Sequence, residues 1–363
     1  MQNQRPIPAT VLERFILGFP STELPKELRR CLAAGLAGVV LYPRNFSSVQ
    51  SLCELTCEIR RAAGRSVLIG IDQEGGTRFS LPEPFTQWPS AAELGSLNDP
   101  GTVERMAIAL ARELRAAGCN LDFAPMLDLH LQAESPVTKE RSFGADPKRV
   151  AELGAAFARG LATEGILACV KHFPGHGDAK VDPHEALPIF DGTIERLHEM
   201  ELVPFARAVR ERVPLMMTAH IVLPNIDSGK PTTLSRKILH ELLRVSMHFE
   251  GVIVADDLGM GAISQRVQPG EAAVGSFLAG SDLAMLCHEW GQVRPALETT
   301  AAALAARKFP GKEWEASGAR IEKLLLQADG AFQDPPPRTV IGCAEYRLLA
   351  EEIRSAATLV HRK

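Results

Sequence analysis

Short apolar runs alternate with amphipathic stretches along almost the whole chain. The apolar runs are rich in Val, Ile, Leu and Met and contain few polar residues, which is typical of strands buried on both faces. They predict strands at residues 14–17, 38–42, 67–71, 120–124, 165–170, 215–218, 252–255 and 282–286. Strands of this kind occur in parallel sheets that helices cover on both sides.

The stretches between these strands have apolar residues at helical spacing. They predict helices at residues 25–34, 48–63, 100–117, 147–164, 194–211, 235–244 and 270–279. Two of them begin with Asp-Pro pairs, Asp99-Pro100 and Asp146-Pro147, which suit the first turn of a helix. About eight strand–helix units predict an α/β fold of the (β/α)8 barrel type, and an open doubly wound sheet is the alternative.

The chain continues beyond the last predicted strand through further helical segments. These lie at residues 290–308 and 314–327, and a Pro-rich break at 334–337 separates them from a final helix at 343–360. The tail is too short to bury a good core of its own. We therefore expect one barrel domain at residues 1–330 and a C-terminal helical tail at 331–363 that packs on it.

Composition and charge narrow the class of partner. The chain has 363 residues, 45% hydrophobic and 23% charged, and its net charge of −4 gives no reason to expect nucleic acid as a partner. The N-terminus lacks an apolar signal-peptide core and no run reaches ~18 apolar residues, so we expect no membrane partner. The odd number of cysteines, seven, predicts reduced thiols and a cytoplasmic protein.

The segment after the predicted fifth strand is rich in titratable residues. Pro174, Gly175 and Gly177 prevent a helix there and favour a loop. The strand end and the loop carry Lys171, His172, His176, Asp178, Asp182 and His184. Because catalytic groups are often held on loops of a rigid scaffold, we predict that this is the active-site loop.

Polar side chains also follow the neighbouring strands. In a barrel of this kind, the residues just after each strand face the reaction cleft. These residues include Asp72, Asp128, Arg141, Lys171, His172, Thr218, His220, Asp256 and Asp257. Carboxylates accept hydrogen bonds from hydroxyl groups, and Lys and Arg donate them, so the set favours binding of a small polyhydroxylated molecule.

Two groups suit catalysis directly. Asp256 or Asp257, which follow an apolar strand, is a candidate nucleophilic carboxylate. Asp182 and His184 are two residues apart, so the carboxylate can orient the imidazole and raise its pKa, as a general acid and base near neutral pH requires. A hydrogen bond that only stabilises the loop explains this pair equally well.

Five motifs resemble, in the same order, those of glycoside hydrolase family 3. They are Ile-Asp-Gln-Glu-Gly-Gly at 71–76, Arg-Ser-Phe-Gly at 141–144, Lys-His-Phe-Pro-Gly-His-Gly at 171–177, Met-Thr-Ala-His at 217–220 and Ala-Asp-Asp-Leu-Gly-Met at 255–260. The resemblance extends from Phe15 to Leu286. It is greatest for the single-domain bacterial branch, the β-N-acetylglucosaminidases (β-hexosaminidases) of cell-wall recycling.

This resemblance implies a retaining exo-glycosidase that removes terminal N-acetyl-β-D-glucosamine from peptidoglycan-derived muropeptides through a covalent glycosyl-aspartate. It makes Asp256 the nucleophile, and His184 with its partner Asp182 the acid and base in place of a second carboxylate. Family sugar contacts carry over to Asp72, Arg141, Lys171 and His172. The resemblance implies a saccharide or muropeptide partner and no cofactor or metal, and we expect a monomer or homodimer.

Some positions depart from the family pattern. Thr77 stands where an Arg usually follows the Gly-Gly pair, so the sugar contact of that Arg is assigned to Arg78. Lys139 and Glu140 precede the second motif, where a Gly-Asp pair is common. Pro183 lies between the two members of the predicted dyad, where a small polar residue is usual.

Three other functions fit parts of the pattern. A β-glucosidase of the same family is one, since the motifs do not define a pocket for an N-acetyl group. A sugar-binding homologue that has lost catalysis is another, although the retained dyad and nucleophile are evidence against it. The third is a zinc hydrolase built on His172, His176, His220 and Asp256, in which Lys171 would repel the ion.

Overall fold

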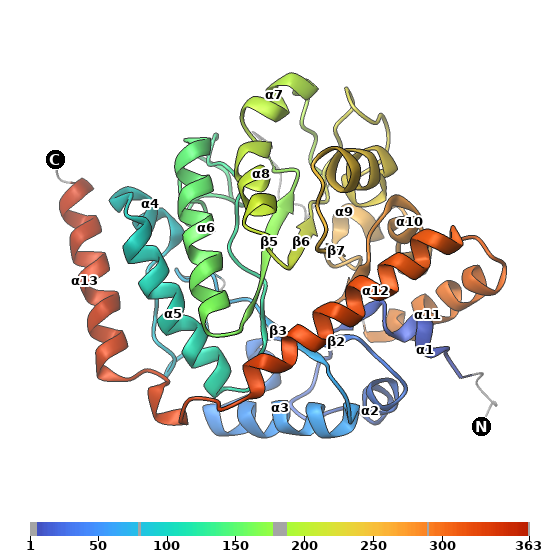
Figure 1. Ribbon diagram of the computed structural model, residues 1–363, viewed down its shortest axis with the longest axis horizontal. Coiled ribbons are helices and arrows are strands. Elements are labelled where there is room, and N and C mark those ends of the chain that lie inside the picture. The colour runs from blue at the N-terminus through green and yellow to red at the C-terminus, as the bar shows by residue number, and fades with distance from the viewer. Residues whose placement is uncertain (1–5, 79–80, 177–186, 289, 362–363) are drawn as a thin grey trace.

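Eight short parallel strands close into a barrel in the order in which they occur along the chain (Figure 1). The computed structural model describes residues 6–78, 81–176, 187–288 and 290–361. The strands are β1 (Phe15–Leu17), β2 (Gly38–Leu41), β3 (Leu68–Ile71), β4 (Leu121–Asp122), β5 (Leu167–Phe173), β6 (Leu215–Thr218), β7 (Val252–Ala255) and β8 (Leu283–Leu286). The barrel closes where β1 pairs with β8, with Ile16 opposite Met285. The predicted (β/α)8 barrel is therefore confirmed, and the open doubly wound sheet is wrong.

Both faces of the strands are buried, which explains why the apolar runs are almost uninterrupted. Successive residues of a strand point to opposite faces. In β2, Val40 belongs to the apolar cluster that fills the barrel, whereas Val39 belongs to the cluster between strands and helices. The same alternation places Leu68 inside the barrel and Ile69 outside it. Each strand residue therefore loses contact with water whichever way its side chain points.

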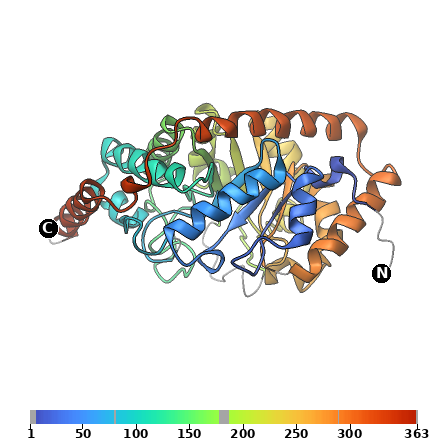
Figure 2. The same cartoon turned by 90° about the horizontal axis from the view of Figure 1, so that it is seen from below.

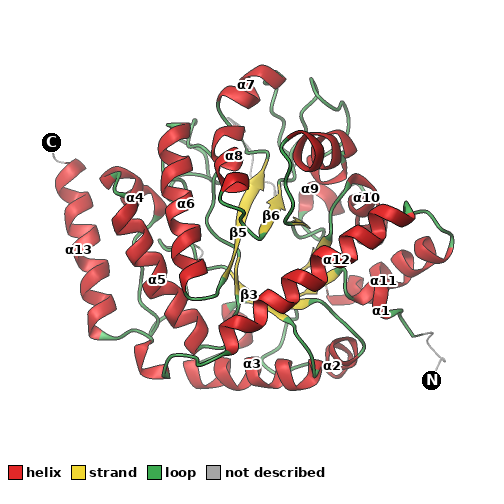
Figure 3. Cartoon of the chain, in the orientation of Figure 1, coloured by secondary structure: helices red, strands yellow, loops and turns green. Residues whose placement is uncertain are grey.

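Helices surround the barrel, as the red ribbons around the yellow strands in Figure 3 show. They are α1 (Ala9–Leu12), α2 (Lys26–Ala33), α3 (Val49–Ala63), α4 (Ala91–Leu97), α5 (Pro100–Ala116), α6 (Pro147–Thr163), α7 (Ile194–Glu199), α8 (Leu202–Arg210), η3 (Lys237–Ser246), α9 (Gly261–Ser264), α10 (Pro269–Ala279), α11 (Trp290–Ala305), α12 (Gly311–Ala328) and α13 (Ala344–His361). Both predicted caps are present: Asp99 accepts a hydrogen bond from the Gly101 amide, and Asp146 accepts one from the Lys148 amide. Such contacts satisfy amides that have no acceptor inside the helix.

Two predicted helices differ from what the structure contains. The helix predicted at 194–211 is divided into α7 and α8, because the chain leaves the helical path at Met200, with φ −124° and ψ −83°. Pro204 has no amide hydrogen, and it lies in the first turn of α8, where amides have no intrahelical acceptor in any case. The helix predicted at 235–244 is present as η3, which winds as a π-helix.

Strand β5 extends further than the apolar run and includes Lys171 and His172. The segment that follows β4 provides the additional backbone partners. The Lys171 amide donates to the Pro125 carbonyl oxygen at 3.2 Å, and the Leu127 amide donates to the Lys171 carbonyl oxygen at 2.6 Å. Because these partners are distant in sequence, the composition around Lys171 did not reveal the extension.

The helices after β8 cover one end and one edge of the barrel. Helix α12 lies across the barrel (Figures 1 and 2), and its Ile321 and Leu324 join the apolar cluster of the barrel interior. Helix α13 packs against α4 and α5, with Tyr346 and Ile353 buried. The proposed boundary between barrel and tail at residue 330 stays a prediction. Among the described residues, no helix combines the length and apolar character that crossing a bilayer requires.

Candidate active site

A cleft lies where the carboxyl ends of the strands converge. Its walls include six of the predicted site residues: Asp72, Arg78, Arg141, Lys171, His172 and Asp256. Asp72 directly follows β3, Lys171 and His172 belong to the end of β5, and Asp256 directly follows β7. The two other predicted residues, Asp182 and His184, lie outside the described part of the chain.

Lys171 is held between two carboxylates at one side of the cleft. Its Nζ atom donates to Asp72 Oδ1 at 2.7 Å and lies 2.7 Å from Glu74 Oε1. Arg141 binds the same Glu74 carboxylate with two hydrogen bonds, from Nε and Nη2, each 2.8 Å long. Paired donors of this kind fix both the position and the plane of a carboxylate.

Glu74 is ionised at neutral pH although it is buried. Burial alone would raise its pKa, but the charges of Arg141 and Lys171 lower the pKa of Glu74 to about 2. Burial would lower the pKa of Lys171, and Asp72 and Glu74 raise it instead, so the ammonium group stays charged. Glu74 was given no role from the sequence, although it lies inside the 71–76 motif, two residues after Asp72.

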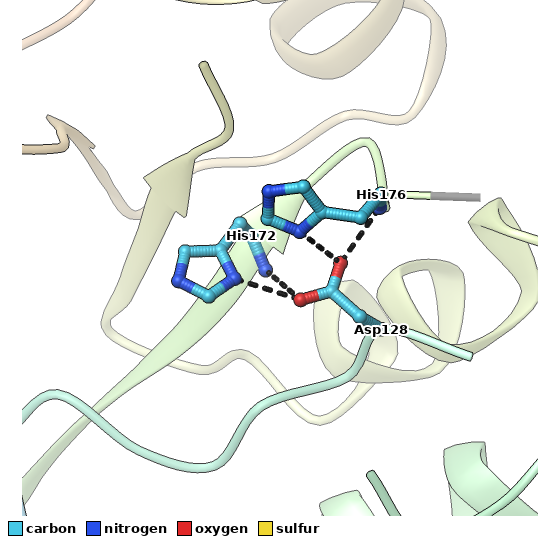
Figure 4. Close-up of side chains that lie close together, drawn as sticks. All are labelled: Asp128, His172 and His176. Atoms are coloured by element: carbon cyan, nitrogen blue, oxygen red, sulfur yellow. Dashed lines mark hydrogen bonds and ion pairs between the residues drawn. The ribbon is translucent and has the colours of Figure 1, made fainter. Parts of the chain in front are cut away.

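A second buried network joins Asp128, which follows β4, to His172 of β5 and to His176, which follows β5 (Figure 4). Asp128 Oδ2 accepts hydrogen bonds from His172 Nδ1 at 2.7 Å and from the His172 amide at 3.2 Å. Asp128 Oδ1 accepts one from the His176 amide at 2.9 Å and lies 3.3 Å from His176 Nδ1. The two imidazole rings meet edge to face, with their centroids 4.9 Å apart.

The protonation of this network follows from its contacts. Burial would raise the pKa of Asp128, but the two neighbouring histidines hold it well below its usual range, so the carboxylate is ionised. Burial lowers the pKa of His172 despite the adjacent carboxylate. His172 is therefore neutral near pH 7.

The described part of the chain contains one group of three side chains close enough to share a metal ion, and it is this one. Both oxygens of Asp128 already accept hydrogen bonds from backbone amides. The zinc site considered from the sequence also required His220. Its Nδ1 lies 2.7 Å from Thr233 Oγ1 and its Nε2 lies 3.0 Å from the Asp257 carbonyl oxygen, so neither ring nitrogen is available to an ion.

The adjacent residues Asp256 and Asp257 have different surroundings. Asp256 is partly exposed in the cleft, and its Oδ1 accepts a hydrogen bond from the Asp257 amide at 2.7 Å. Burial would raise the pKa of Asp256, but His220, His172 and this amide lower it. Asp257 is buried, its Oδ1 accepts from the amides of Gly259 and Cys287, and burial raises its pKa. An ionised carboxylate that faces the cleft is what nucleophilic attack requires, and Asp256 has that character.

Arg78 reaches the cleft from an exposed segment. Its guanidinium donates to the Pro136 carbonyl oxygen at 2.8 Å. The two neighbouring departures from the family pattern contact each other: Thr77 Oγ1 donates to Glu140 Oε1 at 2.7 Å, and the Arg78 amide donates to the same oxygen at 3.1 Å. Glu140 therefore anchors the segment that carries Arg78.

Comparisons with known proteins agree with this geometry. Residues 16–324 match the family described as the glycosyl hydrolase family 3 N-terminal domain. A β-hexosaminidase of Idiomarina loihiensis is 31% identical over 90% of this chain and 97% of its own length. The structure of a family 3 β-N-acetylglucosaminidase from a Paenibacillus species superposes with a TM-score of 0.89 at 32% identity, over 96% of this chain and 68% of that one.

A second solved structure is covered along almost its whole length. NagZ from Neisseria gonorrhoeae, determined in complex with N-trifluoroacetyl-D-glucosamine, superposes with a TM-score of 0.78 at 28% identity, over 95% of this chain and 98% of that one. These findings confirm the predicted family and the predicted enzyme class, a glycoside hydrolase. The chain belongs to glycosyl hydrolase family 3.

Proposed function

We propose that the protein is an exo-acting β-N-acetylglucosaminidase that removes terminal N-acetyl-β-D-glucosamine with retention of configuration. The observation that supports this most is an ionised, partly exposed Asp256 in one cleft with the Asp72, Lys171 and His172 side chains. The names of the similar proteins, β-hexosaminidase and β-N-acetylglucosaminidase, support the same substrate class.

Sugar binding in this proposal depends on the cleft's fixed polar groups. Asp72 accepts hydrogen bonds from hydroxyl groups, and Lys171, which it already binds, keeps the carboxylate in place. Arg141 is oriented by Glu74, so its guanidinium has a fixed position at the cleft wall before the substrate arrives. Groups held in this way lose little conformational entropy when a ligand binds.

Turnover then takes two steps. The Asp256 carboxylate attacks the anomeric carbon while the bond to the leaving oxygen breaks, and His184 gives that oxygen a proton. Water next attacks the glycosyl-aspartate, His184 takes the water's proton, and the sugar leaves with its original configuration. The roles of His184 and Asp182 rest on the family resemblance alone, since both lie outside the described residues.

The finer substrate and location are also part of the proposal. A muropeptide substrate of cell-wall recycling is inferred from the family branch that the motifs resemble. All seven cysteines lie in the described part of the chain and are free thiols, which supports a reducing compartment, the cytoplasm.

Paired aryl substrates test the proposed specificity. We expect 4-nitrophenyl N-acetyl-β-D-glucosaminide to have a kcat/KM about 100-fold or more above that of 4-nitrophenyl β-D-glucoside, since a site built for an amide rejects a ligand that lacks it. A preference for the glucoside would instead identify a β-glucosidase. Saccharide binding without hydrolysis of either compound would identify a sugar-binding homologue.

The assigned acid is tested by the leaving group. Nitrophenolate leaves without a proton, whereas a sugar alkoxide does not, so His184→Ala should lose much less activity on the aryl glucosaminide than on N,N′-diacetylchitobiose. Equal losses on the two substrates would contradict His184 as the acid.

A further inference from the structure

Asp128 is fully buried and does not line the cleft, so it has no direct access to a substrate. Within the described residues, all the hydrogen bonds that its carboxylate accepts come from His172 and His176. His172 and His176, in contrast, both line the cleft. The carboxylate can therefore affect a bound ligand through these two histidines, and it is the His172 ring that it holds at hydrogen-bond distance, 2.7 Å from Nδ1, whereas His176 Nδ1 lies 3.3 Å away.

The contacts determine where the hydrogen of the His172 ring lies. Each oxygen of the Asp128 carboxylate faces a backbone amide, that of His172 or that of His176. Because an amide can only donate, both oxygens act as acceptors in these contacts. A bare Nδ1 lone pair 2.7 Å from a carboxylate oxygen would be repelled, so Nδ1 must be the donor. In a neutral imidazole the other nitrogen, Nε2, then has a free lone pair.

That second nitrogen is directed away from Asp128, as Figure 4 shows. Among the described residues, no side chain or backbone group hydrogen-bonds to His172 Nε2. It is thus an oriented acceptor on the wall of the cleft. A sugar hydroxyl is a ligand group that can donate to such an atom.

We propose that Asp128 is a positioning residue that selects the Nδ1–H tautomer of His172, so that His172 Nε2 accepts a hydrogen bond from a hydroxyl group of the bound sugar. This assignment depends on the proposed function only in taking the ligand to be a sugar. The same carboxylate holds both the backbone and the ring of His172, through its amide and Nδ1, and also accepts from the His176 amide.

The Asp128→Asn variant interferes with this arrangement. An amide has one acceptor oxygen and one NH2 group, so it cannot accept hydrogen bonds from both histidine residues at once. Where the NH2 group faces Nδ1, His172 must place its hydrogen on Nε2 and lose its acceptor for the sugar. Asp122→Asn is a matched control, because Asp122 is equally buried, burial raises its pKa, and the hydrogen bond that its Oδ1 accepts from the Gln73 amide can be accepted equally by an amide oxygen.

The kinetic test is a double-mutant cycle on 4-nitrophenyl N-acetyl-β-D-glucosaminide. Asp128→Asn and His172→Gln should each lower kcat/KM by about 10- to 100-fold, and the double variant should lose no more than the worse single variant. The Asp122→Asn control should stay within about 2-fold of the wild type. Additive losses would show that Asp128 acts independently of His172 and would overturn the proposal.

A spectroscopic test needs neither activity nor a variant of Asp128. Long-range ¹H–¹⁵N correlation of the ten histidines, with His172 assigned from the His172→Gln spectrum, reports which ring nitrogen carries hydrogen. We expect the Nδ1–H form in the wild type; the Nε2–H form would overturn the proposal. If the wild type hydrolyses no glucosaminide, the proposed function fails, and the tautomer measurement still decides the role of Asp128.

Discussion

Each end of the barrel contains an aspartate beside a strand, but the two aspartates are bonded very differently. At the amino end Asp282, which precedes β8, accepts from Arg320 at one oxygen and from Arg244 and the Ile253 amide at the other. At the carboxyl end Asp256, which follows β7, accepts one hydrogen bond on Oδ1, and within the described residues its Oδ2 has none. The first carboxylate is saturated by the protein, and the second retains capacity for a ligand.

This difference shows what separates a structural carboxylate from a functional one in this fold. Both groups are carboxylates at the end of a barrel strand, but Asp282 is fully buried whereas Asp256 is partly exposed in the cleft. The distinction is the number of acceptor positions that remain when the chain is folded. Asp256 lies at the end of the barrel where the carboxyl termini of the strands meet, so its free acceptor positions face the cleft.

The largest effect should come from Asp256. Replacing it by Ala removes the proposed nucleophile, so kcat on the aryl glucosaminide should fall by about 10,000-fold or more. Since few protein groups depend on Asp256, the thermal unfolding temperature should change little. If Asp256→Ala keeps more than a tenth of the wild-type kcat, Asp256 is not the nucleophile, and its functional contrast with Asp282 is wrong.

The opposite result is expected for Asp282. Asp282→Ala leaves the Arg244 and Arg320 guanidinium groups without their buried partner, so the free energy of unfolding should fall by about 3 kcal/mol. Denaturant unfolding measures this change. The activity of the folded protein should be nearly unchanged; a large fall in kcat with normal stability would contradict a purely structural Asp282.

Glu74 is an intermediate case, since it is buried and fully bonded like Asp282 but binds two residues of the cleft wall, Arg141 and Lys171. Its folded pKa of about 2 is below the ordinary value of 4.5, so it stabilises the fold above pH 4.5, and this contribution is lost as the pH falls towards 2. Between pH 5 and 3 the wild type should lose about 2 kcal/mol of unfolding free energy from this group. In Glu74→Gln this part of the pH dependence should be absent, as urea titrations at the two pH values would show; an unchanged dependence would contradict the assignment.

The smallest effect is expected at the rim of the cleft. Glu140→Ala releases Thr77 and the Arg78 segment, but these residues are exposed, so kcat/KM should fall by only about 2- to 5-fold, mainly through KM. Glu134→Ala, at an exposed position in the same region, is the control and should have no effect. A 100-fold loss of kcat/KM in Glu140→Ala would mean that the rim is as important for activity as the residues of the cleft wall.

Much of the architecture could be predicted from local pattern. Both faces of each strand pack against apolar residues, so each strand appears in the sequence as a short run of Val, Ile and Leu. The helices between the strands have apolar residues at helical spacing. Polar residues just after those runs identified the cleft wall, including Asp72, Lys171 and Asp256. These features are local, because burial and periodicity act on neighbouring residues.

The pairings that give those residues their chemistry were decided only by the tertiary structure. His172 and Asp128 are 44 residues apart, and Arg141 and Glu74 are 67 apart, so no local pattern connects them. Likewise, nothing in the sequence around Asp256 and Asp257 indicates that one carboxylate faces the cleft while the other binds the amides of Gly259 and Cys287. Barrel closure brings these groups together, and the partners that each carboxylate then meets determine its charge and its free acceptor positions.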